Sequence, residues 1–201
     1  MSKTLLIETH TFKPNPVSLT ENVNKENGNL IVEGILATAE VKNGNGRYYS
    51  KDLWDREMGK YDELIKQRRS TGELDHPESQ VINLKNVSHL ISGYWWDGDN
   101  IMGKIEILPT PSGNILKALI TAGVTCGVSS RGMGTLEQNG NVMEVQDDFE
   151  LLCWDFVSTP SNPGSFMHTL QEGKKVLNHD YIKVNSIVRE ILCSKGSCTI
   201  F

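Results

Sequence analysis

The sequence predicts an α+β protein in which most strands are antiparallel and two helices accompany them. Three observations support this prediction. Short apolar runs of strand length recur along the chain, turn sequences such as Asn-Gly and Asp-Gly separate several of them, and one long segment repeats apolar residues at helical spacing. A regular alternation of strands and long helices, which a parallel sheet would require, is not apparent.

The first half of the chain is expected to hold an arm, a strand and a helix. Residues 9–29 are polar and include prolines, which favours an extended arm or loop. The apolar run 30–37 predicts a largely buried strand, and Asn-Gly-Asn-Gly at 43–46 predicts a turn. Ser50 is a suitable N-cap for a helix over 51–69. The apolar residues of this helix form one core-facing stripe: Leu53, Trp54, Met58, Tyr61, Leu64 and Ile65.

The second half is expected to contain two hairpins and a short helix. Strand-like runs at 87–96 and 101–108 flank Asp-Gly-Asp-Asn, which is a hairpin signature. Ser112 can cap a short helix over 113–122. Asn-Gly at 139–140 predicts the second hairpin.

The chain divides into a domain and a tail. We predict one domain over residues 1–168, followed by a C-terminal tail over 169–201 that begins with polar residues. The end of the tail repeats apolar residues at helical spacing, which predicts an amphipathic helix: Ile182, Ile187, Val188, Ile191 and Leu192.

The composition argues against several classes of protein. With 201 residues, 38% of them hydrophobic, the chain can bury the core of one ordinary domain. Its net charge of −5 leaves no basic stripe for phosphates, so we expect no nucleic-acid partner. No apolar run approaches membrane-spanning length and the N-terminus lacks a signal-peptide pattern. We therefore expect no membrane association and a protein that works in the cytoplasm where it is made.

The cysteines predict neither disulfides nor a metal site. Cys126 and Cys153 lie in apolar runs and are expected to be small core residues. Cys193 and Cys198 have His179 as their nearest histidine, which does not complete a zinc ligand set. We expect no metal and no other cofactor.

Asp155 is the acidic residue of most interest, because it lies in the apolar run 149–157. Burying a carboxylate there is costly unless it is hydrogen-bonded. Two interpretations remain open: an aspartate that holds the turn before 159–160, or a buried carboxylate that orients a histidine. Alternation along a strand would put four apolar residues on the face of Asp155: Phe149, Leu151, Cys153 and Val157.

Two histidines have informative surroundings. His76 lies between Asp75 and Pro77, which fixes an extended backbone and excludes the interior of a helix. Such a histidine is either a surface or capping residue or a catalytic base. His89 lies in an apolar strand-like run and is expected to be a hydrogen-bonded core residue.

The segment GVSSRG, residues 127–132, is either a polar turn or the carrier of a nucleophile. It does not match the G-x-S-x-G elbow of α/β-hydrolases, because Arg131 replaces the second glycine. A serine hydrolase of another fold needs a nucleophile, a base, an orienting group and oxyanion donors. The chain could supply these with Ser129, His76, Asp155 and the backbone N–H groups of Ser130 and Arg131.

Three segments, in order, resemble the prohead core maturation proteases of T-even-type tailed phages. They are GELDHP at 72–77, GVSSRG at 127–132 and WDFVSTPSNP at 154–163. Further similarities are LLIET near the start, VEGILATAEVKNGNGRYY at 32–49 and the pair Trp95-Trp96, so the resemblance spans roughly residues 4–168. This family is related to the herpesvirus assemblins, which implies a small β-barrel flanked by helices.

The resemblance implies a role for each candidate residue. His76 matches the general base and Ser129, the first serine of the pair, matches the nucleophile. Asp155 matches the acidic strand position, where herpesvirus enzymes use a second histidine. Ser130 and Arg131 would serve the oxyanion through a backbone N–H group, or in the case of Arg131 through its side chain and a water.

The resemblance also implies a function. The protein is expected to be a serine endopeptidase that cleaves phage scaffold or core proteins and major capsid protein precursors during prohead maturation. It would cut after Glu in Leu/Ile-x-Glu sites, inside the prohead in the host cytoplasm. Self-cleavage between Glu172 and Gly173 would release the tail. The alternative is a non-catalytic prohead scaffold or core protein that retains the protease fold, and the sequence leaves open whether the chain forms a homo-oligomer.

Overall fold

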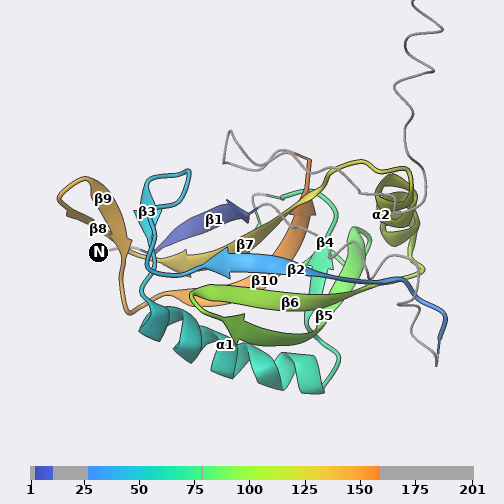
Figure 1. Cartoon of the computed structure of the whole chain (residues 1–201), viewed down its shortest axis with the longest axis horizontal. Helices are drawn as coiled ribbons and strands as arrows, with labels where there is room; N and C mark the ends of the chain where they lie inside the picture. Colours follow the sequence, from blue (N-terminus) through green and yellow to red (C-terminus); the bar gives the residue numbers. More distant parts are fainter. Residues whose placement is uncertain (1–2, 11–26, 78, 159–201) are drawn as a thin grey trace, which may run out of the picture. The chain divides into compact units, whose positions relative to one another are not determined.

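The computed structural model describes residues 3–10, 27–77 and 79–158. This part of the chain is a mixed α/β protein with mostly antiparallel strands in three sheets (Figure 1). The α+β prediction is confirmed in this form.

The first sheet has the order β1-β7-β10 and carries the serine pair. Its strands are β1 (Thr4–His10), β7 (Gly127–Gly134) and β10 (Glu150–Val157), and both pairings are antiparallel. The segment GVSSRG is therefore not a polar turn but a buried strand between two others. The polar side chains of this strand can be buried because they form hydrogen bonds and ion pairs within the protein.

The second sheet has the order β2-β6-β5-β4. It consists of β2 (Ile31–Thr38), β6 (Asn100–Ile107), β5 (Val87–Asp97) and β4 (Thr71–Glu73). The β5–β6 hairpin turns at Gly98, whose φ of 61° lies in the left-handed region that glycine favours. This confirms the first predicted hairpin.

The third sheet is small and has the order β3-β9-β8. Its strands are β3 (Arg47–Tyr48), β9 (Val142–Val145) and β8 (Leu136–Asn139). The β8–β9 pair turns at Asn139-Gly140, as predicted, and β3 pairs with β9 in parallel.

Helix α1 (Lys51–Lys66) begins as expected, with the Ser50 hydroxyl accepting a hydrogen bond from the Leu53 N–H. Most of its predicted stripe is buried: Leu53, Trp54, Met58 and Tyr61. Helix α2 (Pro111–Thr121) is capped by Thr110 instead of the expected Ser112. The reason is that Pro111 is favoured at the first helical position, which makes the residue before it the cap.

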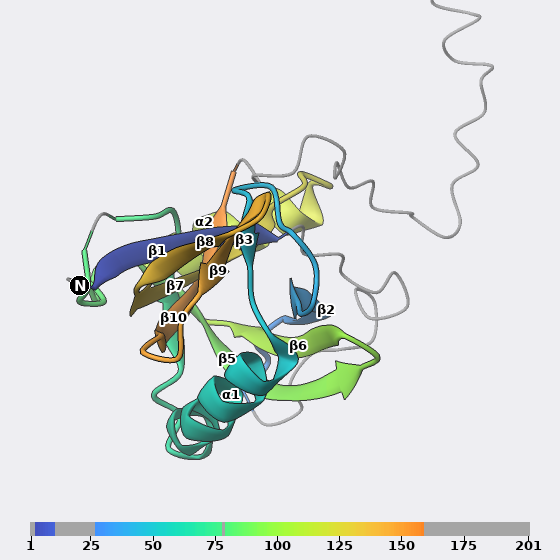
Figure 2. The same cartoon turned by 90° about the vertical axis from the view of Figure 1, so that its left-hand side faces the viewer.

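An aromatic cluster joins α1 to the first sheet. Trp54 of α1 stacks on Tyr49 and on Trp154 of β10, with ring centroids 5.1 and 5.5 Å apart. Phe149 packs edge-on against Tyr49 and Trp54. Figure 2 shows α1 running beneath the strands. Its buried apolar residues belong to the hydrophobic core: Leu53, Trp54, Met58 and Tyr61.

The described strands do not form the expected closed barrel. The first and second sheets are linked where β4 meets β10 by an isolated bridge between Leu74 and Phe156. β4 is three residues long, and beyond this bridge no ladder joins the two sheets among the described strands.

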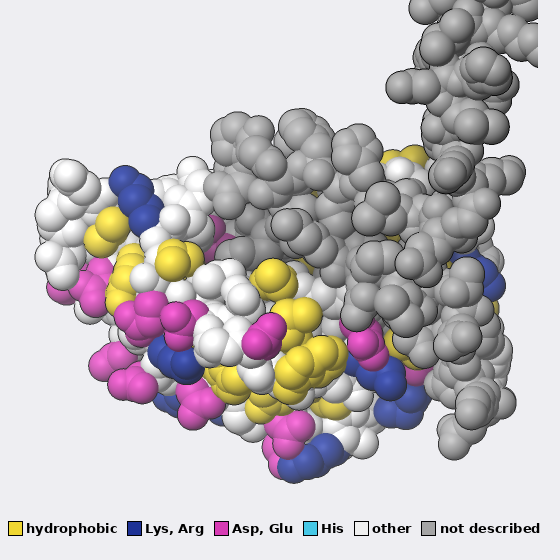
Figure 3. All heavy atoms as spheres, viewed as in Figure 1, with side chains coloured by type: hydrophobic (Ala, Val, Ile, Leu, Met, Phe, Trp, Pro, Cys, Tyr) yellow, Lys and Arg dark blue, Asp and Glu magenta, His cyan; other side chains and the backbone are white. Residues whose placement is uncertain are grey.

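The described surface carries charges of both signs. Figure 3 shows acidic and basic side chains interspersed on one face, in keeping with the modest net charge of −5.

Candidate active site

Ser129 and Ser130 lie on opposite faces of β7. Ser129 is paired across the sheet with Asp155 and Ser130 with Trp154. Because paired residues share a face, Ser129 lies with the carboxylate of Asp155, whereas Ser130 faces the aromatic core. Of the two hydroxyls, that of Ser129 therefore lies on the polar face.

His76 is positioned by the chain just after β4. Asp75 has a φ of 71°, and its N–H donates to the Phe156 carbonyl at 2.7 Å. Together with the bridge between Leu74 and Phe156, this contact ties the segment before His76 to β10. The imidazole is held over the sheet, with 15% of the side chain exposed.

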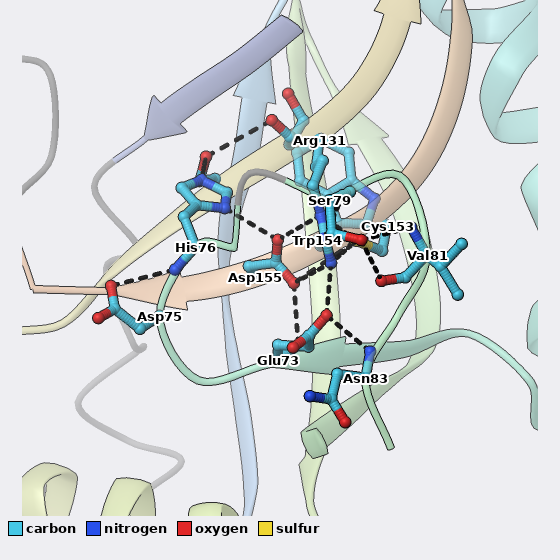
Figure 4. Close-up of polar contacts among 12 residues, drawn as sticks. Glu73, Asp75, His76, Ser79, Val81, Asn83, Arg131, Cys153, Trp154 and Asp155 are labelled. Carbon is cyan, nitrogen blue, oxygen red and sulfur yellow. Dashed lines mark hydrogen bonds and ion pairs between the residues drawn. The ribbon is translucent and has the colours of Figure 1, made fainter. Parts of the chain in front are cut away.

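The His76 ring lies between Ser129 and Asp155, and Figure 4 shows its contact with Asp155. Its Nδ1 lies 2.9 Å from Asp155 Oδ2, and its Nε2 contacts Ser129 Oγ. An ionised carboxylate can only accept hydrogen bonds, so Nδ1 carries the proton and Nε2 is free to accept one from the serine. The structure thus brings together the predicted nucleophile, base and orienting group.

Asp155 is fully buried and strongly hydrogen-bonded. Besides His76, its carboxylate accepts from the Glu73 N–H at 2.9 Å and lies 3.0 Å from Arg131 Nε. Burial alone would raise the pKa of Asp155, but the hydrogen bonds from His76 and Glu73 and the charge of Arg131 outweigh it and lower this pKa. Of the two interpretations of Asp155, the geometry matches the buried carboxylate that orients a histidine.

The strand that carries Asp155 contains an irregularity that sequence alternation did not predict. The register shifts between Leu151 and Cys153, so Leu151 pairs with Gly132 and Cys153 pairs with Arg131. This bulge moves Leu151 to the face opposite Asp155, whereas Cys153 stays beside it. Strand alternation predicted that Leu151 and Cys153 both share the face of Asp155. This prediction is wrong for Leu151, which precedes the bulge, and right for Cys153, which follows it.

The Arg131 side chain lies beneath the three candidate catalytic groups. Its guanidinium donates to the Ser79 carbonyl at 2.7 Å and to Glu73 Oε1 at 3.0 Å, in addition to its contact with Asp155. Cys153 Sγ lies 3.2 Å from Arg131 Nε. These contacts give the guanidinium a structural and electrostatic role at the carboxylates.

The backbone of Ser130 and Arg131 belongs to the middle strand of the first sheet. Successive N–H groups of such a strand point alternately toward its two neighbours. The assignment of these N–H groups to the oxyanion stays a prediction.

Glu73 and Ser79 contact Arg131 at the site, although no motif in the sequence pointed to either of them. Glu73 is buried, pairs with Arg131 and accepts from the Asn83 N–H at 3.0 Å, which fixes the loop after His76. The sequence did contain one signal for an acidic partner, which is Arg131 itself. An arginine inside a buried strand requires a counter-charge. The partner could not be chosen from the sequence, since it lies 58 residues away along the chain.

The other candidates fall outside this cluster. His89 is buried and hydrogen-bonded to Ser88 and the Trp154 carbonyl, so the core assignment is confirmed. Within the described ranges, no group of His, Cys, Asp and Glu could hold a metal ion. No helix in that part of the chain is long and apolar enough to span a membrane. Glu172, Gly173 and the predicted tail helix lie outside the described residues.

A hydroxyl, an imidazole and a buried carboxylate linked in this order form the arrangement used by serine hydrolases. Residues 15–175 match the family described as prohead core protein serine protease, so the chain belongs to this family. The prohead core protein protease of enterobacteria phage T4 is 33% identical over 143 residues, which are 69% of this chain and 68% of that protein. The solved structure of the bacteriophage T4 capsid assembly protease gp21 aligns with a TM-score of 0.68 and 28% identity, covering 79% of this chain and 99% of that chain.

Proposed function

We propose that this member of the prohead protease family is a serine endopeptidase that cleaves scaffold or core proteins and major capsid protein precursors after Glu in Leu/Ile-x-Glu sites. It acts inside the prohead, in the host cytoplasm. The observation that carries the proposal is the contact of His76 with both Ser129 and Asp155. Membership of a family of prohead proteases supports the substrate class.

The geometry supports a two-step acyl transfer. Ser129 Oγ attacks the carbonyl carbon after the glutamate while His76 Nε2 takes its proton, and the same nitrogen then protonates the leaving amine. Water hydrolyses the acyl-enzyme in the second step with the same proton relay. Asp155 holds the imidazole in the required tautomer and stabilises the imidazolium. We assign the oxyanion to the one N–H group, of Ser130 or Arg131, that points away from β10.

The two serines provide a direct test. We expect Ser129→Ala and His76→Ala each to abolish cleavage of a peptide containing Leu-x-Glu, because each removes a group that takes part in proton transfer. Ser130→Ala should retain substantial activity, since this side chain faces the core. Mass spectrometry of the peptide products measures the outcome and gives the cleavage position.

The controls separate the proposal from its alternative. A wild-type protein that leaves both the peptide and a scaffold protein intact would favour the non-catalytic scaffold protein. An inactive Ser130→Ala variant beside an active Ser129→Ala variant would reverse the assignment of the nucleophile. Labelling by a fluorophosphonate that is lost in Ser129→Ala would support the assignment independently.

A further inference from the structure

Strand β10 carries Asp155 at an edge of the first sheet. β7 is its neighbour on one side, and among the described strands of this sheet none lies on the other side. In the interior of a sheet, strands on both sides bond the backbone and fix it. At this edge, groups from outside the sheet must hold the carbonyls that point away from β7.

The carbonyl before Asp155 is held by a side chain. His89 Nε2 lies 3.0 Å from the Trp154 carbonyl oxygen, which belongs to the peptide group that joins Trp154 to Asp155. The carbonyl after Asp155, that of Phe156, accepts from the Asp75 N–H at 2.7 Å. Asp155 therefore lies between two bonded carbonyls, and an imidazole of the second sheet holds one of them.

Both ring nitrogens of His89 have a partner, which fixes its tautomer. A carbonyl oxygen can only accept, so Nε2 carries the proton and Nδ1 accepts from the Ser88 hydroxyl, 2.8 Å away. The ring is fully buried and packs edge-on against the Phe156 ring, with centroids 4.8 Å apart. His89 thus contacts both neighbours of Asp155, Trp154 through a hydrogen bond and Phe156 through its ring.

Gly72 leaves the space through which the His89 ring reaches β10. Gly72 and His89 lie opposite each other in the β4–β5 pair. A Cβ at position 72 would lie 2.5 Å from His89 Nε2 and 1.9 Å from the Trp154 carbonyl oxygen, so the hydrogen bond passes beside the glycine. β4 ends at Glu73, and His76 follows three residues later. The strand that carries Asp155 and the strand that leads to His76 therefore meet at this bond.

We propose that His89 is a positioning residue, which fixes the place of Asp155 relative to His76. It does not touch the reacting atoms. Its hydrogen bond orients the peptide group before Asp155, and its ring sets the separation of β4 and β10 at Gly72. The inference rests on the proposed function, because it names a further residue on which the same site depends.

Removing the donor tests the proposal. His89→Met replaces the ring by an apolar chain and leaves the Trp154 carbonyl without its bond. We expect kcat for a Leu-x-Glu peptide to fall about tenfold or more, because small displacements of catalytic groups are costly. KM should stay within about twofold of wild type, since the buried His89 cannot contact the peptide. The kcat is expressed per folded molecule, with the folded fraction taken from near-UV circular dichroism.

His89→Gln is the conservative variant. Its amide can place an N–H where the imidazole Nε2–H lies, so it should recover most of the wild-type kcat. A role in packing alone would favour methionine, which fills apolar gaps without burying a polar group. A wild-type kcat in His89→Met, or a kcat in His89→Gln no higher than that in His89→Met, would overturn the proposal.

Glu57→Met is the matched control. Glu57 is also buried, and it accepts a hydrogen bond from the Leu151 N–H of β10 at 3.0 Å, before the bulge that separates Leu151 from Asp155. This variant removes a contact with β10 but leaves the Trp154 carbonyl bonded, so it should lower the free energy of unfolding and keep kcat near wild type. An equal fall of kcat in Glu57→Met and His89→Met would overturn the proposal, since any loosening of β10 would then suffice.

A proton NMR measurement separates the inference from the function on which it rests. In Ser129→Ala, the His76 Nδ1 proton bonded to Asp155 should give a low-field resonance that is absent from His76→Ala. Adding His89→Met should shift or broaden this resonance, and adding Glu57→Met should not. An unchanged resonance with His89→Met would overturn the inference. If wild type cleaves neither the peptide nor a scaffold protein, the proposed function fails, and the resonance still tests the position of His76.

Discussion

Arg131 balances two buried carboxylates directly beneath His76 and Ser129. Asp155 and Glu73 each lie 3.0 Å from its guanidinium, and all three side chains are fully buried. A carboxylate removed from water without such a partner would take up a proton. With Arg131 in place the pKa of Asp155 is lowered despite burial, so Asp155 stays ionised at neutral pH and can support the imidazolium.

Asp155→Asn should keep the fold and lower kcat by a factor on the order of 10⁴. An amide presents an N–H toward the histidine as readily as an oxygen, which allows the wrong imidazole tautomer. Peptide cleavage measures kcat, and near-UV circular dichroism verifies the fold. Asp99→Asn, at an exposed aspartate, should cleave like wild type. A fully active Asp155→Asn variant would remove Asp155 from the mechanism.

His89 should make stability depend on pH. Burial lowers the pKa of His89 to about 4, and the neutral ring bonds to Ser88 and to the Trp154 carbonyl. Between pH 6.5 and 4 the unfolded chain binds more protons than the folded protein. The contribution of the neutral His89 ring to the free energy of unfolding is therefore complete above pH 6.5 and is lost as the pH falls toward 4. The loss should amount to about 3 kcal/mol.

Urea unfolding of wild type and His89→Gln between pH 7 and 4 measures this contribution. The free energy of unfolding of wild type should fall more steeply, since glutamine does not titrate. The difference between the two curves isolates His89 from the carboxylates that titrate in both proteins. Parallel curves would contradict the assignment of this pH dependence to His89.

At the scale of elements, the close approach of β4 to β10 depends on Gly72. A Cβ at this position would lie 1.9 Å from the Trp154 carbonyl oxygen and 2.5 Å from His89 Nε2. Both neighbours are fixed, one as backbone and the other as a buried ring. The glycine therefore lets β4 approach β10, and His76 follows four residues later.

Gly72→Ala should lower the free energy of unfolding by about 1–3 kcal/mol, the usual cost of overpacking. It should also reduce kcat/KM, because the displaced β4 carries His76 away from Ser129. Gly93→Ala is the matched control, since its Cβ would meet Lys104 at an ordinary 4.0 Å. Urea unfolding and peptide cleavage measure the two effects. If Gly72→Ala and Gly93→Ala had the same free energy of unfolding and the same kcat/KM, the close approach of β4 to β10 would not determine the position of His76.

Elements with a local signal could be predicted from the sequence, and elements defined by distant partners could not. The helix after Ser50 and the hairpin at Gly98 follow from capping and turn chemistry. β3 and β4 have two and three residues, which are too few to show an alternation of apolar and polar residues. β1 pairs with β7, which lies more than 100 residues further along the chain. The closed barrel was inferred from resemblance, and the described strands do not form one. Pairing between distant strands leaves no local signal in the sequence, so the residues alone could not test that inference.

The same distinction applies to the candidate site. His76 and Ser129 stand in short motifs, so they could be proposed without the fold. Arg131 could be noticed as a charge in an apolar environment, but its contacts with Glu73 and Ser79 arise only when separate segments meet. The bulge beside Cys153 likewise depends on the partner strand, which is why alternation alone misplaced the residues before it.

At the scale of the whole molecule, we predict self-cleavage between Glu172 and Gly173, outside the described residues. Leu170-Gln171-Glu172 follows the predicted domain, in a polar segment of the kind that proteases reach. The similar sequence at residues 31–33 begins β2, whose backbone is held in a sheet. The second choice is the bond after Glu21.

Intact mass of wild type and Ser129→Ala after prolonged incubation measures self-cleavage. Wild type should lose residues 173–201 and Ser129→Ala should keep them, because the cut requires the proposed nucleophile. A wild-type mass that still includes these residues, under conditions in which a scaffold protein is cut, would contradict the prediction.

The order of the three candidate catalytic groups along the chain has a consequence for synthesis. His76 and Ser129 precede Asp155, and Asp155 lies in β10, the last strand described. β10 also supplies the Phe156 carbonyl that holds Asp75, so the imidazole has no fixed position until this strand has been made. Under the proposed mechanism, a growing chain on the ribosome therefore cannot cut itself or its neighbours before Val157 has left the exit tunnel. In that mechanism, the topology delays proteolysis until β10 has been translated.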